Sequence, residues 1–119
     1  MADGNRIVEL LEAGLKATGL RSRVVANNIA NLETPGYRRK AVDFETALAE
    51  AMQSPSSADL RDVPMELIEP QTTPADATGN DVNLDVEVGE MVKNATMHQT
   101  YLRLLAKTYR QMEQAMGVE

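Results

Sequence analysis

Two long stretches of this chain, one near each end, repeat apolar residues at alternating spacings of three and four. The first covers residues 5–32 and the second covers residues 84–117. Such a heptad pattern is typical of helices that pack along a narrow apolar seam. The seam positions are Val8, Leu11, Leu15, Thr18, Ser22, Val25, Ile29 and Leu32 in the first stretch, and Val88, Met91, Ala95, His98, Leu102, Leu105, Tyr109, Met112 and Met116 in the second. We predict a mainly α-helical single domain, residues 1–119, whose terminal helices pair as a coiled-coil hairpin.

The first helix contains residues that weaken it when it stands alone. Gly14 and Gly19 each cost roughly 1 kcal/mol relative to alanine inside a helix. Thr18 and Ser22 place polar groups on the seam. A hairpin of only two helices also leaves much of its seam exposed. We therefore predict that the monomer is partly disordered, and that the seams are buried against other copies or other proteins.

The segment between the two helices, residues 33–83, has a different composition. FETALAEAM (residues 44–52) suits a short helix capped by Asp43, and MELIE (residues 65–69) suits a short strand. The remainder is rich in Pro, Ser, Thr, Asp and Gly, which predicts a turn and an acidic loop region. We expect this middle segment to supply little core.

The start of the second helix is ambiguous from the pattern alone. DVNLDVEV (residues 81–88) alternates apolar and polar residues as a strand does. We expect an extended lead-in that becomes helical near Asp85, with Asp81 or Asn83 as the N-cap.

Charge is distributed in blocks along a chain whose net charge is −6. Residues 16–40 carry six bases and one acid, and residues 41–90 carry twelve acids and one base. Residues 91–118 carry four bases and one acid. Such blocks attract or repel neighbouring surfaces in an assembly, whereas the acidic total disfavours general nucleic-acid binding.

Residues suited to catalysis or metal binding are few. The chain has no cysteine, and its only histidine, His98, lies on the apolar seam, where we predict an interface residue and not a base. Asp76, Asn80, Asp81 and Asp85 do not have the spacing of a calcium-binding EF-hand loop. Nucleotide-binding loops and zinc-protease motifs are also missing from the sequence. We predict no enzymatic activity, no cofactor and no metal.

The sequence offers no means of crossing a membrane by itself. No apolar run approaches the ~20 residues of a membrane-spanning helix. The start, MADGNRIVELLEAG, is too acidic and amphipathic for a cleaved secretory signal. If the chain leaves the cytoplasm, we expect another route.

The first helix ends abruptly within ANNIANLETPGYRRK, residues 26–40. Pro35 disfavours the helical conformation at Thr34. Pro35 and Gly36 fit the two central positions of a type II turn. We predict that this turn folds Tyr37 back toward the helix end.

Two asparagines precede that turn on one face of the helix. Asn28 and Asn31 are three residues apart, next to seam positions. An asparagine at a helix contact can fix register at some cost in stability. We predict that both set register at a subunit seam, with the basic run of residues 38–40 held beside it.

These residues carry a resemblance to a known family. The motif Asn28-Ile29-Ala30-Asn31, followed by Thr34-Pro35-Gly36-Tyr37-Arg38-Arg39, resembles the N-terminal motif of the flagellar basal-body rod, hook and hook-associated proteins. The short chain is similar to the rod proteins of that family. Within that group, GNDVNLD (residues 79–85) and LLAKTY (residues 104–109) resemble the proximal rod subunits. The resemblance identifies the motif as an assembly element.

The resemblance implies a structural subunit of the bacterial flagellar basal body. Such proteins are exported by the flagellar type III system without a cleaved signal, and they polymerise into the torque-transmitting rod in the periplasmic space. The implied partners are other copies of the chain, the rod subunits FlgC and FlgF, FliE, the MS-ring protein FliF and the export gate. Nucleic-acid binding and direct membrane insertion are not implied. A soluble helical adaptor or regulatory protein that forms a discrete coiled-coil complex is the alternative.

Overall fold

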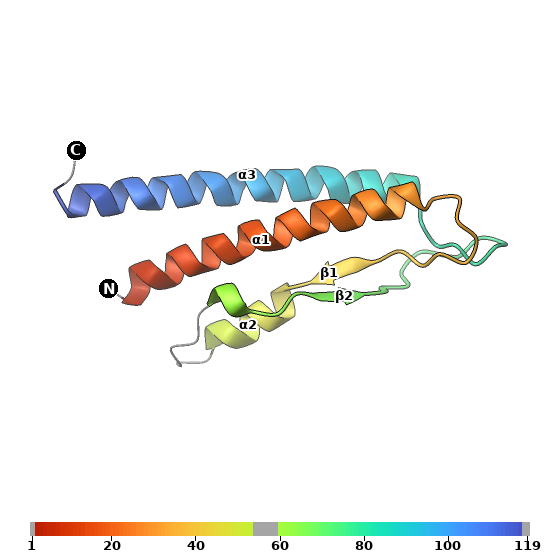
Figure 1. The fold of residues 1–119 in the computed structure, drawn as a ribbon, viewed down its shortest axis with the longest axis horizontal. Coiled ribbons are helices and arrows are strands. Elements are labelled where there is room, and N and C mark those ends of the chain that lie inside the picture. The colour runs from red at the N-terminus through yellow and green to blue at the C-terminus, as the bar shows by residue number, and fades with distance from the viewer. Residues whose placement is uncertain (1, 54–59, 118–119) are drawn as a thin grey trace.

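The computed structural model describes residues 2–53 and 60–117. The elements in chain order are α1 (Ala2–Ala30), β1 (Ala41–Asp43), α2 (Glu45–Gln53), the 3-10 turn η1 (Leu60–Asp62), β2 (Glu66–Ile68) and α3 (Leu84–Ala115). The molecule is long and flat, with extents of 62 × 30 × 15 Å. In Figure 1, α3 lies along one side of α1, and the short elements lie along the other. We call these short elements, residues 41–53 and 60–68, the module. The predicted mainly helical fold with long terminal helices is confirmed.

The end of α1 and the start of α3 both lie close to the predicted positions. The helix α1 stops at Ala30, two residues before the predicted end, because the backbone N–H of Asn31 is shared between the carbonyl oxygens of Asn27 and Asn28, each 3.1 Å away. The helix α3 begins at Leu84 after an extended Asn83. Asn83 Oδ1 accepts a hydrogen bond from the backbone N–H of Val86 at 3.2 Å, so the N-cap is Asn83 and not Asp81.

The module forms at the predicted places. The predicted strand is β2, which pairs antiparallel with β1 in the register Ala41↔Ile68, Val42↔Leu67 and Asp43↔Glu66. The predicted short helix is α2, which follows Phe44, whose carbonyl accepts the backbone N–H of Leu48 at 2.9 Å. Asp43, the expected cap, is the last residue of β1. Part of the predicted loop, residues 54–59, lies outside the described residues.

The apolar core lies between α1 and the module. Its buried members are Ala13, Ala17, Val24, Val42, Phe44, Leu60 and Val63. The expectation that the middle segment supplies little core is therefore wrong. Phe44 and Leu60 are among the most deeply buried side chains of the described chain. The heptad pattern did not reveal this core because positions 13, 17 and 24 lie on a second face of α1, beside the predicted seam.

The predicted seam face of α1 packs on α3. Leu11, Thr18 and Val25 are buried on this face. Val8, Leu15, Ile29 and Leu32 are half-buried, whereas Ser22 is exposed. Thus α1 presents adjacent faces to two different partners, α3 and the module.

The predicted register of α3 needs correction. His98, Leu105 and Met112 are half-buried, as are Tyr101 and Thr108, and Asn94 is buried. Six other predicted seam residues are exposed in the single chain: Val88, Met91, Ala95, Leu102, Tyr109 and Met116.

Two contacts with α1 explain this rotation of α3. The Tyr101 ring lies over Gly14, where an added Cβ would come within 2.4 Å of the ring. Asn94 Nδ2 donates to the carbonyl of Thr18 at 2.8 Å. These contacts turn positions 94 and 101 toward α1, and the apolar positions 95 and 102 away from it.

Candidate functional site

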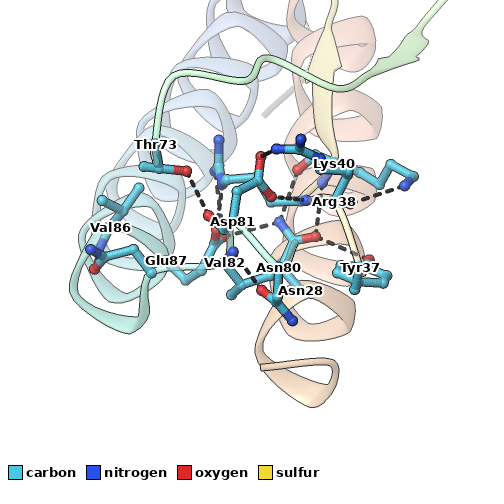
Figure 2. A network of polar contacts seen from close by, with 12 residues as sticks. Asn28, Tyr37, Arg38, Lys40, Thr73, Asn80, Asp81, Val82, Val86 and Glu87 are labelled. Atoms are coloured by element: carbon cyan, nitrogen blue, oxygen red, sulfur yellow. Dashed lines mark hydrogen bonds and ion pairs between the residues drawn. The ribbon is translucent and has the colours of Figure 1, made fainter. Parts of the chain in front are cut away.

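Buried polar side chains gather at the closed end of the hairpin, where α1 ends and α3 begins (Figure 2). They come from α1, from the segment before β1, from the segment before α3 and from the first turn of α3. We call the five of them the polar hub: Asn28, Arg39, Asn80, Asp81 and Glu87. Because buried polar groups are costly unless they are bonded, the partners of each residue show what the hub does.

Asn28 joins three segments of the chain. Its Oδ1 accepts hydrogen bonds from the backbone N–H of Lys40 at 2.9 Å and from the Tyr37 hydroxyl at 3.2 Å. Its Nδ2 donates to the carbonyl of Lys40 at 2.8 Å and to Glu87 Oε1 at 3.1 Å. The Asn28 side chain is 0% exposed, and all of these bonds lie inside the chain.

An ion pair occupies the centre of the hub. Arg39 Nε lies 2.5 Å from Glu87 Oε2, and both side chains are buried. Asp81 Oδ1 accepts the backbone N–H of Arg39 at 2.6 Å, and Asp81 Oδ2 lies 3.4 Å from Arg38 Nη1. Removing one partner of a buried pair is costly, whereas replacing both by apolar groups is often neutral. Such a pair therefore specifies which residues meet more than it adds to stability.

Asn80, which lies about 50 residues further along the chain, bonds to the turn that follows α1. Its Nδ2 lies within 2.7–3.2 Å of three carbonyl oxygens, those of Asn31, Leu32 and Thr34. Its Oδ1 accepts the backbone N–H of Val82 at 2.7 Å. The last carbonyls of a helix lack partners within the helix, and Asn80 supplies a donor to the turn that follows α1. Sequence reasoning weighed Asn80 only as a calcium ligand and missed this role.

Two glycine turns meet at the hub. The predicted type II turn is present: the backbone N–H of Tyr37 donates to the Thr34 carbonyl at 3.2 Å, and Gly36 has φ 74°. Gly79, in the second turn, has φ 88°. A Cβ at Gly79 would lie 3.6 Å from the Gly36 Cα, so the two turns pack directly on one another.

Asp76 organises the second turn. Its Oδ1 accepts hydrogen bonds from the Thr78 hydroxyl at 2.6 Å, from the Thr78 backbone N–H at 2.8 Å and from the Asn80 backbone N–H at 3.1 Å. These bonds, led by the hydroxyl, hold the pKa of Asp76 below its ordinary value. Within residues 2–53 and 60–117, no three His, Asp or Glu side chains are grouped so that they could hold a metal ion.

The remaining motif residues lie at the surface or bond locally. Asn31 Nδ2 donates to the Asn27 carbonyl at 2.8 Å, and Asn31 Oδ1 accepts from the Thr34 hydroxyl at 3.0 Å. Ala30, Thr34, Pro35 and Gly36 are exposed, and Ile29, Tyr37 and Arg38 are half-buried. The motif therefore contains a buried part that shapes the closed end and an exposed part that forms its surface.

His98 lies between the two long helices. Its Nδ1 is 2.6 Å from the hydroxyl of Thr18, which also lies 3.0 Å from the Gly14 carbonyl. A relay in which the imidazole N–H donates to Thr18, and Thr18 donates to Gly14, satisfies all three groups. This arrangement gives His98 a structural role at the α1–α3 contact.

A groove of about 310 Å³ lies between α1, β1 and α3, with Val24, Val42 and Met97 in its lining. On its edge, Arg21 Nη1 donates to Glu45 Oε2 at 2.7 Å. This hydrogen bond lowers the pKa of Glu45 and raises that of Arg21. The two charged groups are thus engaged with each other.

A run of exposed apolar side chains follows α3 along most of its length. We call it the outer stripe: Leu84, Val88, Met91, Val92, Ala95, Leu102, Tyr109 and Met116. Contiguous exposed apolar surface of this kind marks a site of interaction with another molecule. In the part of the chain that the structure describes, no helix combines the length and apolarity needed to cross a membrane.

The chain matches one protein family over part of its length and several individual proteins over most of its length. The family described as "Flagella basal body rod protein" matches residues 11–38, which include α1 from Leu11 onward and the turn after it. The FlgB rod protein of Borreliella burgdorferi is 26% identical over 128 residues, which covers 92% of this chain and 95% of the relative. FlgB of Bacillus subtilis is 28% identical over a region that covers 77% of this chain and 78% of the relative. FlgB of Escherichia coli is 27% identical over a region that covers 80% of this chain and 81% of the relative.

Proposed function

We propose that this chain, which is similar to the FlgB proteins, is a flagellar basal-body rod protein that acts as a proximal rod subunit and polymerises after export. Its family is structural and not a family of enzymes. We infer that it leaves the cytoplasm through the flagellar type III system, without a cleaved signal, and assembles in the periplasmic space.

The outer stripe is the observation that carries the proposal. The stripe consists of seven apolar side chains of α3 and its C-cap residue Met116, all exposed in the single chain. The polar hub fixes the rotation of α3 at its N-terminal end, and this rotation leaves the stripe exposed. Burying it needs another molecule, and burial of apolar surface is the main favourable term in association.

The exposed part of the motif supplies a second candidate contact. Ala30, Thr34, Pro35 and Gly36 form the tip of the hairpin. We propose that this tip meets a neighbouring subunit, while Asn28 and the hub hold its shape. The motif then acts in assembly through the conformation that its buried residues impose.

The partners follow from a proximal position in the rod. We propose contacts with other copies of the chain, with FlgC and FlgF further along the rod, and with FliE, the MS-ring protein FliF and the export gate at the cell-proximal end. Assembly with other basal-body components agrees with the FlgB relatives.

We propose that the isolated monomer is only marginally folded. The molecule is 15 Å thick along its shortest axis, and its core is confined to the space between α1 and the module. A thin core buries too little apolar surface to offset the entropy of ordering the chain. Far-UV circular dichroism of dilute monomer should show low helix content that rises with protein concentration, and cooperative melting independent of concentration would contradict this.

Deletion and complementation test the function. Loss of the gene should abolish motility and leave basal bodies without a complete rod, and the wild-type chain should restore both. The stripe variants Val88→Glu and Leu102→Glu should fail to restore them, whereas Thr100→Glu, an exposed position off the stripe, should succeed. Normal motility after deletion, together with a stable discrete dimer, would favour the adaptor alternative.

A further inference from the structure

The sulfur chemistry of this chain is confined to methionine, because the sequence has seven methionines and no cysteine. A methionine thioether takes up one oxygen from a peroxide and becomes a polar sulfoxide, and exposed sulfur atoms react first. In the described chain the exposed methionines are Met52, Met91 and Met116, at 52%, 43% and 70%. Three others are half-buried: Met65, Met97 and Met112. A peroxide in solution therefore reaches three sites before the rest.

Two of the three exposed methionines belong to the outer stripe. Met91 follows Val88 by three residues and precedes Ala95 by four, so these side chains share one face of α3. Met116, the C-cap residue of α3, lies at the opposite end of the stripe. Met52 belongs instead to α2, which lies across α1 from α3 in Figure 1. The chain thus contains two exposed methionines on the stripe and one away from it as a matched reference.

We propose that Met91 and Met116 are oxidation sites, and that hydrogen peroxide converts the outer stripe from an apolar surface that assembles into a polar surface that does not. A lone pair of Sδ forms the S–O bond while the O–O bond of the peroxide breaks. The proton of the transferred hydroxyl passes to the departing hydroxide, which leaves as water. The sulfur is oxidised and the peroxide is reduced. A methionine sulfoxide reductase reverses the change with two electrons and two protons, and the oxygen leaves as water.

The single chain tolerates the added oxygen, whereas a covered stripe does not. The core lies between α1 and the module, away from both oxidation sites. Met91 borders a hollow of about 440 Å³ between α1 and α3, so an oxygen there has room. Under a neighbouring molecule the sulfoxide oxygen becomes a buried acceptor without a donor, which weakens association roughly tenfold or more. The inference rests on the proposed function, in which another molecule covers the stripe, and it adds control of that contact by oxidation.

Reaction with hydrogen peroxide locates the oxidation sites. Peptide mass spectrometry of the purified wild-type chain should show that Met52, Met91 and Met116 gain oxygen faster than the half-buried methionines. In isolated basal bodies, Met91 and Met116 should react more slowly than in the free chain, because a neighbour covers the stripe. Equal rates at all six described methionines, or rates at Met91 and Met116 that assembly leaves unchanged, would overturn the proposal.

Glutamine variants test the effect on assembly without an oxidant, because glutamine resembles a methionine sulfoxide in length and polarity. Met91→Gln with Met116→Gln should fail to restore motility in the deletion strain, whereas Met52→Gln should restore it. Both variants should keep the helix content of the wild type by circular dichroism in trimethylamine N-oxide, so a loss of motility is not a loss of fold. A double glutamine variant that swims as well as the wild type would contradict the proposal.

Leucine variants separate this inference from the proposed function, because leucine keeps the stripe apolar and carries no sulfur. During a pulse of hydrogen peroxide, cells with Met91→Leu and Met116→Leu should build more new basal bodies than cells with the wild-type chain. If both strains lose assembly equally while the wild-type chain restores motility without peroxide, the oxidation inference fails and the rod function stands. If the wild-type chain cannot restore motility, but peroxide lowers its retention on a phenyl column and the reductase restores it, the oxidation sites stand and the rod function fails.

Discussion

The two ends of the helical hairpin are held together by different means. At the closed end, five buried polar residues tie α1, α3 and both connecting segments to one another. Toward the open end, Leu105, Thr108 and Met112 are only half-buried, and the Tyr109 hydroxyl donates to Glu12 Oε2 at 3.2 Å on the surface. Directional polar contacts specify one arrangement, whereas loosely packed side chains tolerate repacking. The closed end is therefore fixed, and the open end can adjust to a neighbour.

The strongest way to break this comparison is to remove half of the buried ion pair. Glu87→Leu should cost about 3–5 kcal/mol, because it leaves Arg39 buried without its counter-charge. The free energy of unfolding can be measured by urea titration in a buffer that contains trimethylamine N-oxide, which favours the folded chain. The double variant Arg39→Met with Glu87→Leu should recover most of the loss. If the single and the double variant lose the same free energy of unfolding, the unpaired charge of Arg39 is not the source of the loss.

Asn28 and Asn31 provide a test within the motif. Asn28→Ala should cost about 2–3 kcal/mol, because it strands the backbone N–H and C=O of Lys40. Asn31→Ala should cost less than about 1 kcal/mol, because its bonds are local and exposed. The same urea titration measures both variants, and equal losses would show that the hub does not distinguish them.

Two glycines of α1 sharpen the comparison at the α1–α3 contact. Gly14→Ala should destabilise by about 1–3 kcal/mol, because the new Cβ displaces the Tyr101 ring. Gly19→Ala should instead stabilise by up to about 1 kcal/mol, since no atom lies within 4 Å of its Cβ position and alanine favours the helix. Thermal melts of the two variants should move in opposite directions. A stabilising Gly14→Ala would mean that Tyr101 does not set the rotation of α3.

The smallest expected effect concerns the ion pair between Arg21 of α1 and Glu45 of the module. Because the pKa of Glu45 is lowered in the folded chain, its contribution is present above the unfolded pKa and is lost as pH falls through the folded pKa. Glu45→Gln should cost less than about 1 kcal/mol at neutral pH, since Glu45 is exposed. The difference in unfolding free energy from the wild type should shrink in acid. A difference that grows in acid would contradict the direction of the pKa shift.

Local signals in the sequence predict most of the elements and little of their packing. The heptad spacing and the Pro35-Gly36 turn depend on neighbours a few residues apart, so they could be recognised directly, and the cap of α3 could be narrowed to Asp81 or Asn83. The core between α1 and the module joins Ala13 and Ala17 to Phe44 and Leu60 across the chain. No periodicity encodes such a contact, and small alanines give a weak signal of burial.

The candidate site shows the same limit. Asn28 attracted attention because it interrupts a helical pattern, but its partners Lys40 and Glu87 could not be deduced from spacing. No local pattern predicts the bonds of Asn80 and Asp81, because an acidic loop before a helix is an ordinary sequence. Only the packing of the two turns shows that Asn80 bonds to the turn after α1 and that Asp81 bonds to Arg38 and Arg39.

The hub also governs the order in which the chain can fold. Its bonds join residues separated by 59 positions for Asn28 and Glu87, and by 48 positions for Arg39 and Glu87. Contacts between distant residues require a large loop to close first, which slows folding. In a chain that emerges N-terminus first, the Arg39 side chain lacks its buried counter-charge until residue 87 arrives. The closed end of the hairpin therefore forms only after residue 87 is available, later than the contacts between α1 and the module.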